Sequence, residues 1–214
     1  MIATETRTTV GSSLARSPII AVVRTDTIEA AREQSHALLD SGLELLEITF
    51  TVPGASSLVR ELLEARSDDS STWIGMGSVS TRARAEEALA AGSEFIVSPN
   101  VAPDVAAAAR EAGRFLVMGA LTPTEIVSAI ELGADIVKVY PLPAVGGTGY
   151  LEVVRGPLFD VDMLAAGGFG VDEIPSYRAA GAIAFGMAAP LLLGTDGNSN
   201  ANIDRALRLA RGTA

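Results

Sequence analysis

Eight short apolar runs, each followed by an amphipathic stretch, predict a (β/α)8 TIM barrel folded as a single compact α/β domain. No long linker or low-complexity run divides the 214 residues. The predicted helices repeatedly end at a glycine, as left-handed C-caps do; these are Gly42, Gly92, Gly113, Gly133 and Gly181. We expect the barrel at 17–214, after an N-terminal extension or short helix at 1–16. A doubly wound open sheet is the alternative for the same pattern.

The predicted elements alternate along the chain. Strands are expected where apolar and β-branched residues gather, at 17–24, 43–50, 73–79, 95–100, 115–120, 135–141, 161–168 and 182–187. Helices are expected where apolar residues recur with helical spacing, at 26–42, 54–66, 80–92, 102–113, 122–133, 149–156, 171–181 and 199–212. A Gly-rich turn follows the sixth strand, and a loop joins the eighth strand to the last helix.

Strand residues in a barrel alternate between the surrounding helices and the barrel interior. Leu46 and Ile48 share one parity, as do Val137 and Val139, which suits packing against helices. The opposite parity therefore points inward, toward the end of the barrel where active sites lie. The residues expected inward on the first, second and sixth strands are Arg24, Glu47, Thr49, Thr51, Ile136, Lys138 and Tyr140.

The composition excludes several classes of function. A net charge of −10 provides no basic field for nucleic acid or for an anionic membrane. The chain has no Cys and one histidine, His36, in a predicted helix, which argues against a metal site built on a histidine cluster. Residues 1–17 lack the apolar core of a signal peptide, and 182–194 is too short to span a bilayer. We expect a soluble, cytoplasmic protein.

Lys138 is the only lysine among 16 basic residues, and it lies within a predicted strand. Buried charges are rare unless they are paired or functional. One interpretation is a structural salt bridge between Glu47 and Lys138, although such pairs gain little stability over apolar ones. The other is a partly desolvated lysine whose neutral amine attacks a ketone and forms a Schiff base. Glu47 would then move the protons that this chemistry requires.

Five segments around these residues resemble one family, in order and with similar spacing over about residues 17–195. They are "LLEITFTVPGA" (45–55), "GMGSV" (75–79), "EFIVSPN" (94–100), "LTPTEIVSAIELG" (121–133) and "VKVYP" (137–141). The chain resembles the class I aldolases that act on 2-keto-3-deoxy-6-phosphogluconate (KDPG) and 4-hydroxy-2-oxoglutarate (KHG). Each motif is weak alone, but their combination is specific.

The resemblance implies a metal-independent carbon–carbon lyase without a cofactor, which interconverts a 2-keto-4-hydroxy acid with pyruvate and an aldehyde. Lys138 corresponds to the Schiff-base residue and Glu47 to the general acid and base. The resemblance also implies a homotrimer. The residues expected to bind substrate are Arg24, Thr51 and Ser78 at the pyruvate carboxylate, Pro99 and Tyr140 as pocket walls, and Gly167 and Gly168 after the seventh strand.

The chain departs from the pattern of relatives with phosphorylated substrates. Those relatives carry Thr-Gly-Gly after the seventh strand, where this chain has Ala166 before the two glycines. Met187 and Ala188 stand where small and hydroxylated residues cradle phosphate after the eighth strand, and Pro143 stiffens the loop after the sixth. The sequence therefore favours aldolase chemistry more firmly than a phosphorylated substrate, and it leaves open whether the substrate carries phosphate.

Two other functions are compatible with a barrel of this kind. One is an isomerase or epimerase of sugar phosphates that uses Glu47 and other acids. The other is a catalytically silent barrel that binds a keto acid or serves as a subunit of an assembly. The lone Lys138 and the reduced phosphate cradle count against the first, and the presence of both Glu47 and Lys138 counts against the second.

Overall fold

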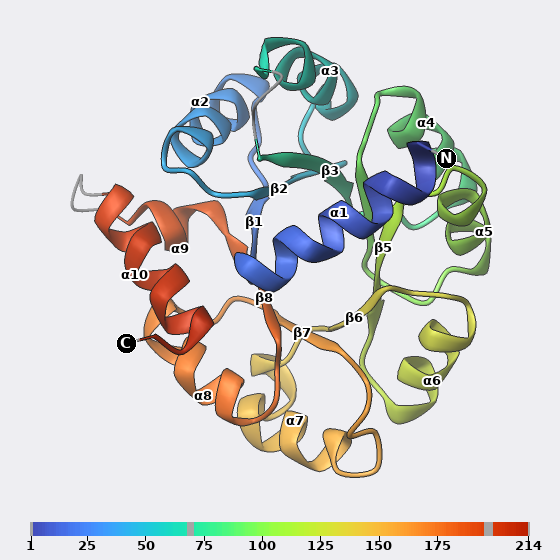
Figure 1. The fold of residues 1–214 in the computed structure, drawn as a ribbon, viewed down its shortest axis with the longest axis vertical. Coiled ribbons are helices and arrows are strands. Elements are labelled where there is room, and N and C mark those ends of the chain that lie inside the picture. The colour runs from blue at the N-terminus through green and yellow to red at the C-terminus, as the bar shows by residue number, and fades with distance from the viewer. Residues whose placement is uncertain (1, 68–70, 195–198, 214) are drawn as a thin grey trace.

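The computed structural model describes residues 2–67, 71–194 and 199–213. Its parallel strands form a closed barrel in sequence order, with β8 paired to β1 (Figure 1). The (β/α)8 prediction is confirmed, and the open-sheet alternative is wrong because the two sheet edges pair with each other. The strands are β1 (Ile19–Val23), β2 (Leu45–Thr49), β3 (Trp73–Gly77), β4 (Phe95–Ser98), β5 (Phe115–Ala120), β6 (Ile136–Val139), β7 (Met163–Ala166) and β8 (Ala184–Ala188).

Helices surround the barrel, and one further helix crosses its end (Figure 1). They are α1 (Ile2–Arg16), α2 (Ile28–Asp40), α3 (Ala55–Ala65), α4 (Arg82–Ala90), α5 (Pro103–Glu111), α6 (Pro123–Glu131), α7 (Gly147–Arg155), α8 (Ile174–Ala179), α9 (Ala189–Leu193) and α10 (Ser199–Arg211), with short 3-10 helices η1 (Pro143–Val145) and η2 (Val171–Glu173). The five glycines expected to end helices have φ between +62° and +100°. None of the helices in the described ranges is both long and apolar enough to cross a membrane.

The expected alternation of strand residues produces two separate apolar layers. Leu46, Ile48, Val137 and Val139 pack in the layer between the strands and the helices. Residues of the opposite parity fill the barrel interior, including Ile20, Leu45, Ile136, Phe95, Val97 and Leu164. The parity assigned to the second and sixth strands is therefore confirmed, and it sends the intervening polar residues inward.

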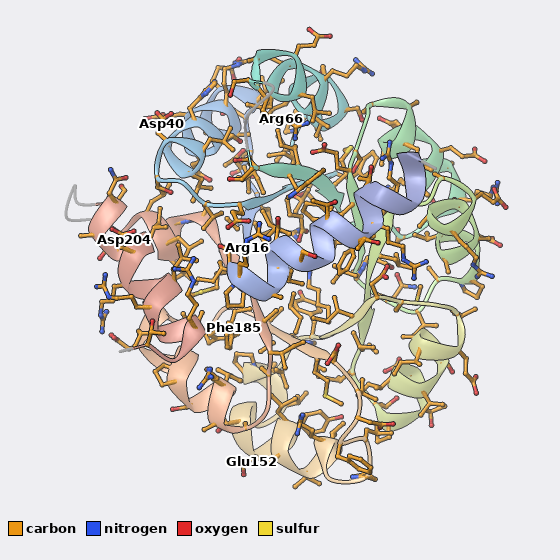
Figure 2. All side chains as sticks on the ribbon, viewed as in Figure 1. Arg16, Asp40, Arg66, Glu152, Phe185 and Asp204 are labelled. Carbon is orange, nitrogen blue, oxygen red and sulfur yellow. The ribbon has the colours of Figure 1, made fainter. Side chains whose placement is uncertain are left out.

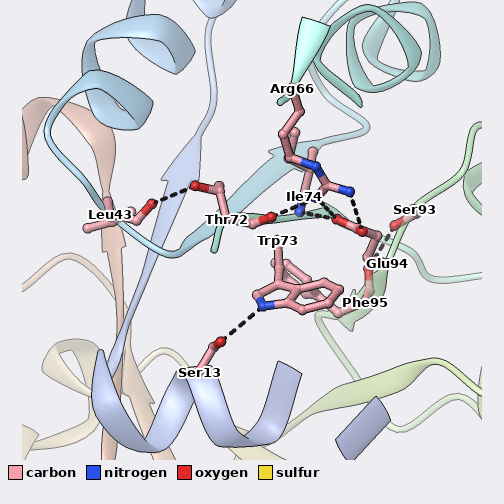
Figure 3. Close-up of polar contacts among 9 residues, drawn as sticks. All are labelled: Ser13, Leu43, Arg66, Thr72, Trp73, Ile74, Ser93, Glu94 and Phe95. Carbon is pink, nitrogen blue, oxygen red and sulfur yellow. Dashed lines mark hydrogen bonds and ion pairs between the residues drawn. The ribbon is translucent and has the colours of Figure 1, made fainter. Parts of the chain in front are cut away.

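Helix α1 closes the end of the barrel where the strands begin (Figure 1). Its Val10 and Leu14 are buried in the interior layer with Phe115, the first residue of β5. Trp73, the first residue of β3, donates its indole N–H to the Ser13 hydroxyl at 2.9 Å (Figure 3). Because this end is filled, the opposite end, at the carboxyl termini of the strands, is left for a functional site.

Polar contacts near α1 bind the strand starts to one another. Arg66 contacts the Glu94 carboxylate through two guanidinium nitrogens, at 2.7 and 2.9 Å, and the same carboxylate accepts the backbone N–H of Ile74 at 2.9 Å (Figure 3). Charged side chains such as Asp40 and Glu152 lie on the outer helices instead (Figure 2). We interpret the Arg66–Glu94 pair as structural, because it lies at the closed end.

Candidate active site

Lys138 lies near the carboxyl end of β6, in register with Gly119 of β5 and Leu164 of β7. Its side chain is half-buried, and its Nζ lies 5.5 Å from the centre of the Tyr140 ring. No ion pair within the described ranges includes Lys138 or Glu47. The structural salt bridge kept as an alternative is therefore not formed, and the amine is free of a carboxylate.

Glu47 points into the barrel from β2 and is only 2% exposed. Its carboxylate occupies space above β3, where Gly77 has no side chain. A Cβ atom at Gly77 would lie 1.7 Å from Glu47 Oε1. In the closed barrel β2 lies across from β6, so Glu47 and Lys138 face the interior from opposite walls. Such an arrangement suits a substrate or water between the carboxylate and the amine.

Arg24 and Ser78 meet beside Glu47. Arg24 directly follows β1 and donates from Nη2 to Ser78 Oγ at 3.4 Å. Ser78 directly follows β3 and has φ +60°, the one positive φ at a non-glycine among the described residues. Its hydroxyl proton has no acceptor within the described part of the chain and is available to a ligand.

The Thr51 hydroxyl, which we predicted to bind the substrate carboxylate, is hydrogen-bonded to Thr49. The Thr49 hydroxyl donates to the Val23 carbonyl at 3.0 Å, and it lies 2.8 Å from the Thr51 hydroxyl. Because a hydroxyl has one proton, Thr51 must donate to Thr49. The Thr51 proton is therefore already used, and binding a carboxylate through it would require the hydroxyl to rotate.

Tyr140 and the Pro99 turn both lie near Lys138. Tyr140 is 42% exposed, and its backbone N–H donates to the Ala120 carbonyl at 3.1 Å. Pro99 follows β4, and its backbone covers Gly119, the register partner of Lys138. A Cβ atom at Gly119 would lie 2.3 Å from the Pro99 carbonyl carbon. The glycine thus admits the Pro99 turn beside the lysine.

The two glycines after β7 have different surroundings. Gly167 has φ +136°, and a Cβ atom there would lie 2.7 Å from Pro143 Cδ and 2.9 Å from the backbone nitrogen of Leu142. Gly167 therefore packs against the loop after β6, and only Gly168, with φ +95° and no atom near its missing Cβ, is open. Ala166 is buried in the barrel interior.

Met187 does not obstruct the mouth of the barrel. We expected its bulk in the position of a phosphate cradle, but its side chain is buried in the layer between strands and helices. The alternation of side chains along β8 explains this. Ala184 faces the barrel interior, and Met187 is separated from it by an odd number of positions, so it faces the helices. Ala188 ends β8 and is the N-cap of α9, where its side chain makes no capping hydrogen bond. The site lacks a hydroxyl here, but it is not filled.

An acidic residue, Glu173, lies at the end of η2, in the segment after β7. Glu173 accepts the backbone N–H of Gly170 at 2.7 Å through its carboxylate. Burial raises the pKa of the Tyr177 hydroxyl, and the negative charge of Glu173 raises it further. That hydroxyl lies beside the start of α7, 3.2 Å from where a Gly147 Cβ would be. The Glu173 carboxylate is therefore a negative charge in the segment after β7, near Tyr177.

Arg84 lies at the mouth but was not identified from the sequence. It is in the first turn of α4, and its Nη1 donates to the Ser78 carbonyl at 3.1 Å and to the Ser80 hydroxyl at 3.2 Å. Its guanidinium carbon lies 5.6 Å from the centre of the Phe50 ring. An arginine in the polar first turn of a helix is usually exposed to solvent. Its closeness to Ser78 in the sequence was therefore the only indication that Arg84 could belong to the site.

Metal binding has no obvious place in the described ranges. They contain no group of three or more His, Asp or Glu side chains that could hold a metal ion. His36 lies away from the mouth, where it lines a cavity of about 270 Å³ with Leu39, Asp40 and Arg66.

Comparison with known proteins gives consistent matches. The model of the family described as "KDPG and KHG aldolase" matches residues 10–206. A 2-dehydro-3-deoxy-phosphogluconate aldolase of Treponema pallidum is 30% identical over 171 residues, which are 80% of each chain. A probable 2-dehydro-3-deoxy-6-phosphogalactonate aldolase of Rhizobium meliloti is 30% identical over 175 residues, 81% of each chain. The solved structure of a 4-hydroxy-2-oxoglutarate/KDPG aldolase from TTHB1 is 28% identical, with a TM-score of 0.77 and coverage of 93% of this chain and 97% of that one.

Proposed function

The chain belongs to the KDPG and KHG aldolase family and is a class I aldolase of keto-deoxy acids, and we propose that its Schiff base forms on Lys138. The observation that carries this proposal is the amine itself. Lys138 is the only lysine, it lies half-buried at the functional end of the barrel, and it has no carboxylate partner in the described ranges. Arginine cannot replace it, because a guanidinium stays protonated and does not form an imine.

The amine attacks C2 of a 2-keto-4-hydroxy acid and gives a carbinolamine, which loses water to become a protonated imine. The C3–C4 bond then breaks as the C4 hydroxyl loses its proton and an aldehyde leaves. The electron pair of that bond passes into the iminium and produces an enamine. Protonation at C3 and hydrolysis release pyruvate and restore the amine. The imine is the electron sink, so we propose that the reaction is independent of metal.

Glu47 is the proposed acid and base for these proton transfers. Its position across the barrel from Lys138 supports this role, since a substrate bound to the lysine extends toward the carboxylate. A water molecule between the carboxylate and the substrate would carry the proton. Tyr140 and Pro99, which lie near Lys138, would shield the imine from bulk water.

The carboxylate of the keto acid is proposed to lie at Arg24 and Ser78. Arg24 supplies a positive charge, and Ser78 supplies a free hydroxyl proton. Thr51 contributes after its hydroxyl turns away from Thr49. An anion held there lies beside Glu47 on β2, since β1 and β3 flank that strand.

The aldehyde portion of the substrate is proposed to lack phosphate. Phosphate sites of TIM barrels are frequently formed by the loops after strands seven and eight. Here the N–H of Gly170 already donates to Glu173, and Gly167 packs against Pro143. The one open glycine in this cluster, Gly168, is a weak cradle for a dianion next to a carboxylate. A neutral, hydroxylated aldehyde fits this charge better.

Turnover assays test the chemistry. Pyruvate release from a 2-keto-4-hydroxy acid should persist in EDTA and fall about 100-fold or more in Glu47→Gln, which should still form a borohydride-trapped adduct with pyruvate. Turnover that EDTA abolishes, or a Glu47→Gln variant as active as the parent, would contradict the proposal.

A comparison of acceptors tests the substrate class. With pyruvate, the kcat/KM for glyceraldehyde should exceed that for glyceraldehyde 3-phosphate. Glu173→Gln should raise the value for the phosphorylated aldehyde several-fold and leave the other unchanged. Asp172→Asn is the control, because Asp172 pairs with Arg205. A parent enzyme that prefers the phosphorylated aldehyde would refute this part of the proposal.

The resemblance to the family further supports a homotrimer in the cytoplasm. Val153 and Phe159 are 76% and 72% exposed, and apolar side chains of this kind are compatible with contacts between subunits. Light scattering of the purified protein measures the assembly directly. A mass of three chains would agree with the proposal, and a monomer at micromolar concentration would contradict it.

A further inference from the structure

Arg84 is held at the mouth of the barrel by uncharged groups. Its guanidinium donates to the Ser78 carbonyl at 3.1 Å and to the Ser80 hydroxyl at 3.2 Å, and it lies over the Phe50 ring. These contacts fix the direction of the side chain without neutralising its charge. The side chain therefore turns back from α4 toward the ends of β2 and β3.

A second arginine in the same helix turn, Arg82, differs from Arg84 in that it contacts carboxylates. Arg82 lies two residues earlier in the same helix turn, and it contacts the carboxylates of Glu86 and Glu111, each at 2.8 Å. Within the described ranges Arg84 has no carboxylate contact of this kind. The charge of Arg82 is therefore paired with carboxylates on the surface, whereas, among the described residues, the charge of Arg84 is unpaired beside the site.

Two guanidinium groups converge on Ser78. Arg24 approaches its hydroxyl at 3.4 Å, while Arg84 binds its carbonyl. Like charges held on one residue repel each other, and an anion placed between them removes that cost. The planar guanidinium also matches a carboxylate, which it can bind through two parallel hydrogen bonds.

We propose that Arg84 binds the carboxylate of the 2-keto acid together with Arg24, and so selects ketones that carry a carboxylate. This inference rests on the proposed function, since it assigns Arg84 to the substrate that forms the imine with Lys138. Arg84 and Arg24 would hold opposite sides of the anion, with the Ser78 hydroxyl proton directed at it. A ketone without a carboxylate gains nothing from Arg84.

Borohydride trapping with two ketones tests the inference. Pyruvate carries the carboxylate, and acetone lacks it. Arg84→Gln should raise the pyruvate concentration for half-maximal trapping about ten-fold or more, the effect of losing one charged hydrogen bond. Trapping of acetone should be unchanged. Arg82→Gln, which removes the same charge from the same helix turn, should stay within two-fold of the parent for both ketones.

The acetone reaction also reports whether the variant is folded with a reactive lysine. An Arg84→Gln variant with the parent's pyruvate dependence would overturn the inference. An equal loss of acetone and pyruvate trapping would overturn it as well, because it would assign Arg84 to positioning the loop after β3. A parent protein that traps neither ketone would instead refute the proposed Schiff base on Lys138.

Discussion

At the scale of single residues, two glycines leave the space that neighbouring functional groups occupy. Gly77 leaves room for the Glu47 carboxylate, and Gly119 leaves room for the Pro99 turn. In each case a Cβ atom would lie less than 2.5 Å from the neighbouring group. The site therefore depends on glycines that carry no chemistry themselves, which a search for reactive side chains cannot find.

Gly77→Ala should disable proton transfer without removing any reactive group. The new methyl group would displace the Glu47 carboxylate, and we expect turnover to fall about 100-fold or more, as for loss of a general acid and base. Pyruvate should still be trapped on Lys138. Steady-state kinetics and adduct mass measure the two effects separately.

Gly149→Ala is the matched control, because no atom lies within 4 Å of the Cβ position at Gly149. That variant should keep parental turnover. If Gly77→Ala also turned over at the parental rate, the proposed dependence of Glu47 on this gap would be wrong.

The elements show what local sequence can and cannot predict. All eight strands were predicted, because apolar runs and their parity are fixed by burial on both faces of a barrel strand. The sequence pattern does not predict helix α9, because Pro190 interrupts the apolar segment and favours a loop. Proline is nevertheless well tolerated in the first turn of a helix, where its N–H is not needed.

The sequence predicts some residues of the candidate site and not others. Glu47 and Lys138 stood out because charged residues interrupt buried strands. Arg84 did not, since its position depends on how a surface helix turns one side chain inward. The burial of Met187 between the strands and the helices follows from the parity of β8, which similarity to the motif of relatives does not reveal.

Helix α6 begins with a capping box that titrates. Glu125 accepts the backbone N–H of Thr122 at 2.8 Å, that of Leu121 at 3.0 Å and the Thr122 hydroxyl at 3.0 Å. These bonds, the backbone N–H of Thr122 first, hold the pKa of the Glu125 carboxyl below its usual value of 4.5. A carboxyl with a depressed folded pKa stabilises the fold above its unfolded pKa and loses this effect as the pH falls through the folded value.

Glu125→Ala should therefore lower the Tm at pH 7 by a few degrees, since a helix cap contributes about 1 kcal/mol. The difference from the parent should shrink as the pH falls below 4.5. Thermal melts at several pH values measure it, with the exposed Glu152→Ala of α7 as control. A difference that stayed constant down to pH 3 would exclude a contribution from the carboxylate.

At the scale of the whole molecule, one end of the barrel contributes to stability and the other carries the residues proposed for catalysis. Helix α1 fills the end where the strands begin, with Val10 and Leu14 in the interior layer. The residues proposed for catalysis and binding come from the other end, where the strands finish. Changes at the closed end should therefore affect stability and leave the chemistry intact.

Leu14→Ala tests this division. We expect its free energy of unfolding to fall by about 2–3 kcal/mol, as for a buried leucine, measured by urea denaturation. Trapping of pyruvate by the folded variant should match the parent. Val127→Ala, at a position 41% exposed, is the control and should change the free energy of unfolding little. A stable Leu14→Ala variant that no longer reacted with pyruvate would contradict the separation.

We propose that every side-chain imine of this protein forms on Lys138, its only lysine. Incubation with pyruvate, reduction with borohydride and mass spectrometry of the intact protein test it most directly. The parent chain should gain one reduced pyruvate, mapped by peptide analysis to Lys138, and Lys138→Arg should gain none. A parent without an adduct, or an adduct on the Lys138→Arg variant, would contradict the claim.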